Sequence, residues 1–256
     1  MDAARLAMRP AIVVRVTQLA QDIPSGRSFV SLFLSKYLRS PFFTSFVPFL
    51  KSSFLSYKYT TTREHPDLFP TLATGKQPQI LWLGCSDSRC PETFMMGLQP
   101  GDVFVHRSIA NILHPGDLSS GAVIEYAVQH LGVEHIVVCG HTSCGGVAAA
   151  MGNKQLGILD PWLLPLRQVR ERNLEMLQSL SAESAGEAAL KLVELKVRES
   201  LNVVIQKSVV LNAIQERDLE VYSLIYDVAS GVLRELDIQD SQDAIRARLI
   251  AFKAEV

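Results

Sequence analysis

The chain has 256 residues, of which 48% are hydrophobic, and its 25 basic and 26 acidic residues give a formal net charge of −1. A chain of this length can bury one substantial core. The even charge balance and the lack of a Lys/Arg-rich block argue against a nucleic-acid-binding protein.

Residues 1–57 differ in composition from the rest of the chain. They contain seven Lys/Arg, only two acidic residues, nine Ser and seven of the eleven Phe. Basic, Ser-rich and acid-poor segments resemble mitochondrial transit peptides, and the alternative is an arm that is disordered or packs on a partner. The longest uncharged run within this segment, residues 40–50, is too short to cross a bilayer. We therefore expect an N-terminal extension over 1–57, a single domain over 58–256, no membrane span and a mitochondrial or cytoplasmic location.

Apolar runs and helical patterns alternate from residue 58 onward. Runs that are apolar on both faces are typical of buried parallel strands, and three of them lie at residues 80–83, 103–105 and 135–140. Residues 120–131 repeat apolar side chains at helical spacing between the second and third run, which predicts a βαβ unit.

The C-terminal half continues this alternation. Residues 190–204 predict a long helix and residues 221–226 a further strand. The Ser230-Gly231 pair indicates a turn into Val232-Leu233, as in a hairpin. The sequence thus predicts an α/β fold with a central, mostly parallel β-sheet flanked by α-helices.

Two polar clusters follow two of the predicted strands, Cys85-Ser86-Asp87-Ser88-Arg89 and His141-Thr142-Ser143-Cys144. Gly84 and Gly140 precede them, and glycine would let the backbone turn there. Ligand sites of open α/β sheets form beyond the carboxyl ends of the strands, so the clusters can meet. We therefore expect a metal site at this edge of the sheet.

The ligands Cys85, His141 and Cys144 are three soft donors and leave one coordination position open. Catalytic zinc sites keep three protein ligands, whereas structural sites are usually closed by four. All four cysteines of the chain lie in or beside the clusters, which favours a reducing compartment with thiolates free for metal over a disulfide framework. The sequence therefore predicts one catalytic Zn²⁺ per chain.

Asp87 and Arg89 are predicted to assist this metal site. The carboxylate can accept a hydrogen bond from a metal-bound water, and the planar guanidinium can orient the carboxylate. In a closed alternative, Asp87 itself is the fourth ligand. Arg107 is predicted either to organise the site or to brace a loop.

The C-x-D-x-R and H-x-x-C motifs together resemble the β-class carbonic anhydrases of plants and fungi. The resemblance extends over roughly residues 63–240, and further family-like stretches are residues 97–107, 109–111, 125–128, 139–146, 201–206 and 226–227. Each motif alone is weak, but both in this order are specific.

The resemblance implies reversible hydration of carbon dioxide to bicarbonate and a proton by zinc-bound hydroxide. It implies Cys85, His141 and Cys144 as zinc ligands and Asp87 and Arg89 as catalytic residues. It also implies a homodimer or homotetramer whose site is completed by a neighbouring chain. The substrate-binding positions by the same resemblance are Phe104, Tyr126, Gln77, Lys76 and Gly145.

Relatives usually carry Gly-Gln-x-Pro before the first strand, and this chain has Gly75-Lys76-Gln77-Pro78. Either Gln77 takes over the substrate contact, or Lys76 places a cation beside bicarbonate, or the contact is lost. Two other functions stay open: a carbon disulfide or carbonyl sulfide hydrolase on the same scaffold, and a weakly active zinc-dependent assembly or regulatory paralogue.

Overall fold

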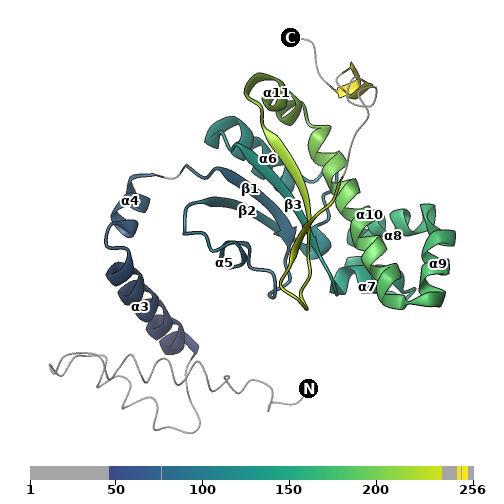
Figure 1. Cartoon of the computed structure of the whole chain (residues 1–256), viewed down its shortest axis with the longest axis horizontal. Helices are drawn as coiled ribbons and strands as arrows, with labels where there is room; N and C mark the ends of the chain where they lie inside the picture. The colour runs from purple at the N-terminus through teal and green to yellow at the C-terminus, as the bar shows by residue number, and fades with distance from the viewer. Residues whose placement is uncertain (1–45, 76, 238–246, 249, 253–256) are drawn as a thin grey trace, which may run out of the picture. The chain divides into compact units, whose positions relative to one another are not determined.

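The computed structural model describes residues 46–75, 77–237, 247–248 and 250–252, and Figure 1 shows their course. Residues 1–45 of the predicted N-terminal extension 1–57 and the predicted role of Lys76 lie outside the described residues. The chain divides into two compact units, residues 1–75 and 76–256, and each is described by itself.

The described part of the first unit consists of two helices, α3 (Phe46–Glu64) and α4 (Leu68–Thr74). α3 continues through residue 57, where the composition of the sequence changes. The rings of Tyr57 and Phe69 lie 5.9 Å apart, edge to face, and join the two helices. Among the described residues, none of the helices combines the length and the apolar character that a membrane span requires.

The second unit is built on a five-stranded sheet with the strand order β2-β1-β3-β4-β5. The first four strands in this order are parallel, and β5 pairs antiparallel with β4. The strands are β1 (Ile80–Cys85), β2 (Val103–Ser108), β3 (His135–His141), β4 (Glu220–Tyr226) and β5 (Leu233–Glu235). The predicted strands, the hairpin and the mostly parallel α/β fold are therefore confirmed.

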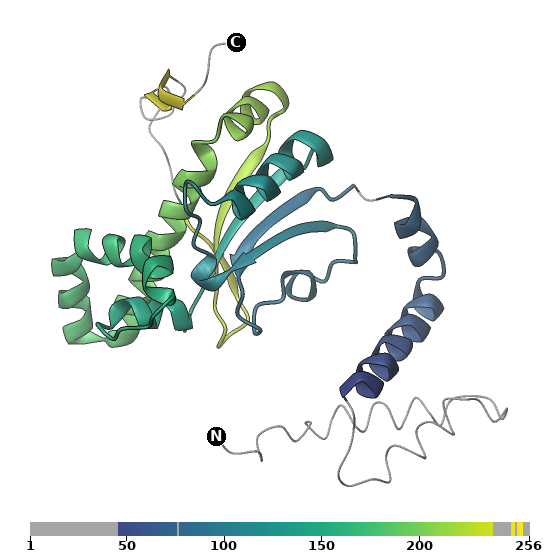
Figure 2. The same cartoon turned by 180° about the vertical axis from the view of Figure 1, so that it is seen from behind.

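Helices and helical turns connect the strands. They are α5 (Glu92–Met95), η2 (Ile109–Asn111), α6 (Leu118–Glu125), η3 (Tyr126–Leu131), α7 (Gly145–Met151), α8 (Leu159–Arg172), α9 (Leu174–Glu183), α10 (Ala185–Ile205) and α11 (Ser208–Arg217). The helix predicted over residues 120–131 is α6, which passes into a π-helical segment in η3. Figure 2 shows α10 running from α8 and α9 at one end to α11 at the other.

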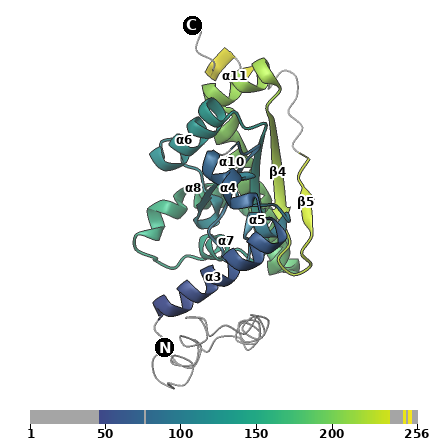
Figure 3. The same cartoon turned by 90° about the vertical axis from the view of Figure 1, so that its left-hand side faces the viewer.

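The two faces of the sheet bury different amounts of apolar surface. Successive side chains of a strand point to opposite faces, so Leu81 and Leu83 enter the larger core and Trp82 enters the smaller one. Figure 3 shows α6, α8 and α10 on one side of β4, and residues from these helices belong to the larger core. Cys85 continues the Leu81 and Leu83 face, which directs its thiol toward this core.

Candidate functional site

The three predicted metal ligands converge at the carboxyl edge of the sheet. Cys85 ends β1, His141 ends the neighbouring parallel strand β3, and Cys144 is the N-cap residue of α7. Their ligand atoms all lie within 4.8 Å of one another, and the side chains are buried. The structure thus forms a cluster of two thiols and one imidazole that could hold a metal ion.

The protonation of the cluster fits a soft metal ion. Nδ1 of His141 donates to the carbonyl oxygen of Thr142 at 2.9 Å, which leaves Nε2 as the ring nitrogen available to a metal ion. Nε2 is buried and has no hydrogen-bond partner among the described residues. The hydrogen bond between the two thiols lowers the pKa of Cys85 and raises that of Cys144, so without a metal ion the thiolate form, which binds metals, is favoured on Cys85. Two sulfurs and one imidazole nitrogen are donors that zinc prefers.

The glycines before the clusters do not turn the chain, as the sequence suggested, because Gly84 and Gly140 lie inside β1 and β3. Neither has a positive φ. A Cβ atom at Gly84 would overlap the Trp82 indole, and one at Gly140 would lie 2.7 Å from Val197 Cγ2 of α10. These glycines therefore allow close packing rather than a turn.

Asp87 and Arg89 form a bidentate ion pair beside the cluster. Arg89 Nε donates to Asp87 Oδ1 at 2.9 Å, and Nη2 donates to Oδ2 at 2.7 Å. The same Nη2 donates to the Ser143 carbonyl oxygen at 3.0 Å, which ties the pair to the second cluster. Asp87 Oδ2 lies 3.9 Å from His141 Nε2. The hydrogen bonds from Arg89 hold the pKa of Asp87 well below its usual range.

Arg107, at the carboxyl end of β2, supports the first cluster by donating hydrogen bonds to its backbone carbonyl oxygens. Its Nε donates to the Cys85 carbonyl oxygen at 2.7 Å, and its Nη2 donates to the Asp87 carbonyl oxygen. The Glu92 carboxylate lies 3.8 Å from Nε and balances its charge. Arg107 thus braces a loop, and that loop carries two of the predicted site residues.

A hydroxyl contact beside His141 was missed by sequence reasoning. Thr142 Oγ1 donates to Asp227 Oδ1 at 2.8 Å and accepts from the Val228 backbone N–H at 3.0 Å. These bonds join the end of β3 to the loop after β4. The signals in the sequence are that Thr142 follows a predicted ligand and that Asp227 lies in the family-like stretch 226–227, but nothing in the sequence pairs these residues, which are 85 positions apart.

The predicted substrate-binding residues lie in different places. The rings of Phe104, in β2, and Tyr126, in η3, are 5.7 Å apart. Gly145 is exposed at the start of α7. Gln77 is exposed and precedes β1, whereas Cys85 ends that strand. The length of β1, roughly 17 Å at this strand rise, therefore separates Gln77 from the cluster within one chain.

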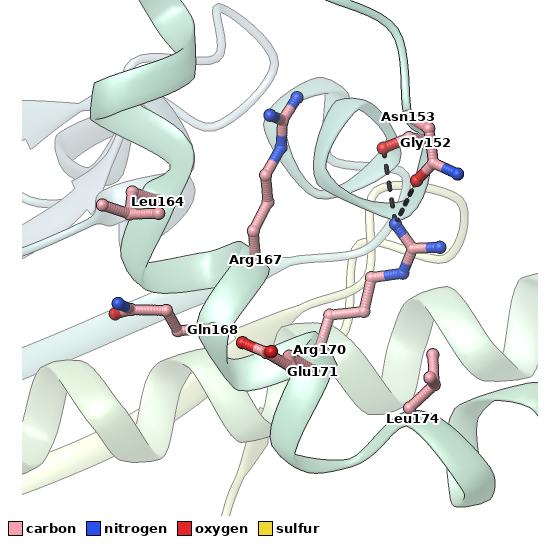
Figure 4. Close-up of a pocket in the computed structure, with 8 residues that line it drawn as sticks. All are labelled: Gly152, Asn153, Leu164, Arg167, Gln168, Arg170, Glu171 and Leu174. Carbon is pink, nitrogen blue, oxygen red and sulfur yellow. Dashed lines mark hydrogen bonds between the residues drawn. The ribbon is translucent and has the colours of Figure 1, made fainter.

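A separate pocket of about 390 Å³ lies at the other end of α7 (Figure 4). Arg170 Nη1 donates to the Gly152 carbonyl oxygen and to Asn153 Oδ1, as the dashed lines show, and it also reaches the Ala150 carbonyl oxygen at 3.2 Å. Carbonyls at a helix C-terminus attract a cation. The lining residues include none of the predicted site residues and are Gly152, Asn153, Leu164, Arg167, Gln168, Arg170, Glu171 and Leu174.

Known proteins share both the sequence and the fold of this chain. A family model described as carbonic anhydrase matches residues 80–233. A carbonic anhydrase of Emericella nidulans is 47% identical over 68% of this chain and 75% of its own length. The solved β-carbonic anhydrase CafA of Aspergillus fumigatus is 59% identical, covers 82% of this chain and 100% of its own, and superposes with a TM-score of 0.80.

A second solved relative comes from another filamentous fungus. It is one of two tetrameric β-carbonic anhydrases of Sordaria macrospora, which is 44% identical, with a TM-score of 0.73 over 75% of this chain and 98% of its own. The family model, the curated relative and the solved structures agree with one another and with the motifs around Cys85 and His141. The chain therefore belongs to the carbonic anhydrase family, and within that family to the β class.

Proposed function

We propose that this protein is a zinc-dependent carbonic anhydrase that interconverts carbon dioxide and bicarbonate. Cys85, His141 and Cys144 are the proposed zinc ligands, and Asp87 with Arg89 is the pair that acts on the reacting water. One observation carries the proposal: three soft ligand atoms lie within 4.8 Å of one another, with an ionised carboxylate beside them. Family membership supports the same reaction.

Zinc bound by these three residues would lower the pKa of a water molecule and so supply hydroxide near neutral pH. Asp87 Oδ2 lies 3.9 Å from His141 Nε2 and is an acceptor for the hydrogen bond of that water. Because the pKa of Asp87 is lowered, its carboxylate orients the water without retaining the proton. Arg89 fixes the direction of the carboxylate through two hydrogen bonds.

The contacts of Asp87 support an open fourth position over the closed alternative. Both of its carboxylate oxygens accept hydrogen bonds from Arg89, and Oδ1 also accepts from the Arg89 backbone N–H at 2.9 Å. Ligation of a metal by Asp87 would break part of this arrangement. The same bonds leave the position free for water or substrate.

The substrate pocket is proposed to be shared between chains. Phe104 and Tyr126 offer an apolar wall suited to carbon dioxide. Gln77 lies at the opposite edge of the sheet, so its predicted contact with substrate requires a second copy of the chain. The tetrameric relative from Sordaria macrospora is consistent with a homodimer or homotetramer. Light scattering of the purified chain would measure the oligomeric state.

Stopped-flow carbon dioxide hydration on zinc-quantified protein tests the proposal. Cys85→Ser and His141→Ala should lose both zinc and hydration activity, because each removes one of three ligands. Cys139→Ser is the matched control, since Cys139 is a buried thiol of β3 outside the ligand set. Full zinc occupancy with unchanged turnover in either ligand variant would refute the assignment. Hydrolysis of carbon disulfide without hydration of carbon dioxide would support the proposed metal site and contradict the proposed substrate.

A further inference from the structure

A buried lysine joins α10 to the η2 turn. Lys196 Nζ donates to the Asn111 carbonyl oxygen and to Ser200 Oγ, the latter at 2.7 Å, and Ser200 Oγ donates to the same carbonyl at 3.2 Å. Lys196, Ser200 and Asn111 are each at most 4% exposed. Lysine is almost never fully buried, so this group has a structural or functional reason to lie here.

The turn that these bonds hold has an unfavourable backbone. Ala110 has a φ of 57° and Asn111 a φ of 41°, both in the left-handed region that non-glycine residues rarely adopt. Such conformations persist where the surrounding structure imposes them. The two donors aimed at the Asn111 carbonyl are part of that surrounding structure.

η2 lies between the two segments that carry the proposed zinc ligands. A Cβ atom at Gly146, two residues after Cys144, would lie 2.8 Å from Ala110 Cβ, so the turn packs directly on the start of α7. On its other side, η2 follows Ser108, whose carbonyl accepts a hydrogen bond from the Ser86 backbone N–H at 2.9 Å. Ser86 is the residue next to Cys85.

The same face of α10 also contacts β3, the strand that carries the third proposed ligand, His141. Val193 and Val197 pack against Gly140, where a Cβ atom would lie 2.9 Å and 2.7 Å from their methyl groups, and Gly140 precedes His141. Residues 193, 196, 197 and 200 follow the spacing of one helix face. This face therefore abuts β3 directly and reaches the Cys144 segment through η2.

We infer that Lys196 is a positioning residue of the metal centre, which anchors η2 from α10 and so fixes the Cys85 segment relative to the Cys144 segment. The inference rests on the zinc site proposed above. Lys196 touches neither substrate nor metal in this role and acts through Asn111 and Ala110.

The hydrogen-bond inventory of Lys196 fits this role. Burial lowers the pKa of Lys196 well below its ordinary value, which favours the neutral amine. The Nζ group donates to two acceptors, the Asn111 carbonyl and Ser200 Oγ. No carboxylate pairs with Lys196 in the part of the chain that the structure describes. The lysine therefore serves as a fixed donor rather than as half of an ion pair.

The test removes the amine of Lys196 and measures two properties that depend on the geometry of the metal centre, the Co²⁺ absorption spectrum and the rate of zinc release. Lys196→Met keeps most of the side-chain volume and removes both donors. We expect the Co²⁺-substituted variant to show a shifted visible absorption spectrum, and its zinc to pass to a chelator about 10-fold faster than zinc from the wild type, in the range found when outer-shell partners are lost. Lys191→Met is the matched control, because Lys191 is a partly exposed lysine of the same helix that pairs with Glu194. It should match the wild type in both readouts.

Ser200→Ala is a milder second variant that removes one acceptor of Lys196 and one donor to Asn111. It should change both readouts in the same direction and by less, and it decides the question if Lys196→Met does not fold. A lowered melting temperature with an unchanged Co²⁺ spectrum and unchanged zinc release in both variants would overturn the inference and leave Lys196 as a packing residue. A wild-type chain that binds neither ion would instead contradict the proposed zinc site.

Discussion

The guanidinium of Arg89 holds the carboxylate of Asp87 at both oxygens, with Nε 2.9 Å from Oδ1 and Nη2 2.7 Å from Oδ2. Because the guanidinium is planar and donates two parallel hydrogen bonds, it fixes both the orientation of the carboxylate and its distance. The third bond, from Nη2 to the Ser143 carbonyl oxygen, anchors the guanidinium to the segment between His141 and Cys144. Arg89 therefore sets where Asp87 points relative to the metal centre.

Arg89→Lys keeps the positive charge but loses the pair of parallel hydrogen bonds to the carboxylate, so it should misorient Asp87 without removing a zinc ligand. We expect kcat for carbon dioxide hydration to fall by about 100-fold, the scale of positioned proton-transfer groups, with zinc content unchanged. Arg172→Lys is the control, because Arg172 pairs with Glu199 at an exposed site. Equal rates for Arg89→Lys and the wild type would show that the orientation of Asp87 does not limit the reaction.

The lowered pKa of Asp87 predicts how the ion pair responds to acid. Above the ordinary aspartate pKa of about 3.9, Asp87 is ionised in both the folded and the unfolded chain, so its contribution to the free energy of unfolding is constant. Below that pH, the unfolded chain takes up the proton first, and the contribution shrinks as the pH falls toward the lower folded pKa.

Urea unfolding of chelator-treated wild type and Asp87→Asn measures this contribution as the difference between the two proteins. The difference should be equal at pH values of about 6 and about 5 and smaller at about 3.5. A difference that instead grows as the pH falls from about 6 to about 3.5 would mean that the pKa of Asp87 is raised rather than lowered.

Gly140→Ala tests the close packing of α10 on β3. The new Cβ atom would lie 2.7 Å from Val197 Cγ2 and 2.9 Å from Val193 Cγ1, so the helix or the strand must shift. We expect a loss of about 1–3 kcal/mol in the free energy of unfolding, as for other overpacked cores. Gly116→Ala should change it by less than about 0.5 kcal/mol, because a Cβ atom there meets nothing within 4 Å. Adding Val197→Ala should restore part of the loss, and full stability of Gly140→Ala would contradict the packing argument.

Thr142→Val removes the hydroxyl that joins the residue after His141 to Asp227 and Val228. The side-chain volume is nearly conserved, so a change reports on the two hydrogen bonds. Zinc affinity measured by competition with a chelator should fall about 10-fold, while Ser223→Ala, a buried hydroxyl of β4 elsewhere in the sheet, should keep it. Unchanged affinity in Thr142→Val would mean that the loop after β4 does not position His141.

The strands and the ligand set could be predicted from the sequence because their signals are local. Continuous apolar runs mark β1, β2 and β3, and the ligand clusters begin where β1 and β3 end. The rule that parallel strands present their carboxyl ends at one edge then brings Cys85, His141 and Cys144 together.

The supporting contacts could not be predicted because their partners are far apart in sequence. Thr142 meets Asp227 across 85 residues, and Lys196 meets Asn111 across the same number. Lys196 did carry one local signal, since it lies three residues after Val193 and so breaks the apolar face of α10. Gly84 and Gly140 were misread because a glycine at a strand end suggests a turn, whereas the neighbours that exclude a Cβ atom are visible only in three dimensions.

The central claim is that hydration of carbon dioxide depends on zinc held by Cys85, His141 and Cys144. The most direct measurement is stopped-flow hydration during stepwise return of zinc to chelator-treated protein, with bound metal quantified at each step. The rate should rise in proportion to bound zinc and stop rising at one zinc per chain, and Cys85→Ser should show neither binding nor rate. A metal-free chain that hydrates carbon dioxide as fast as the zinc-loaded chain, or a fully loaded chain that does not exceed the uncatalysed rate, would contradict the claim.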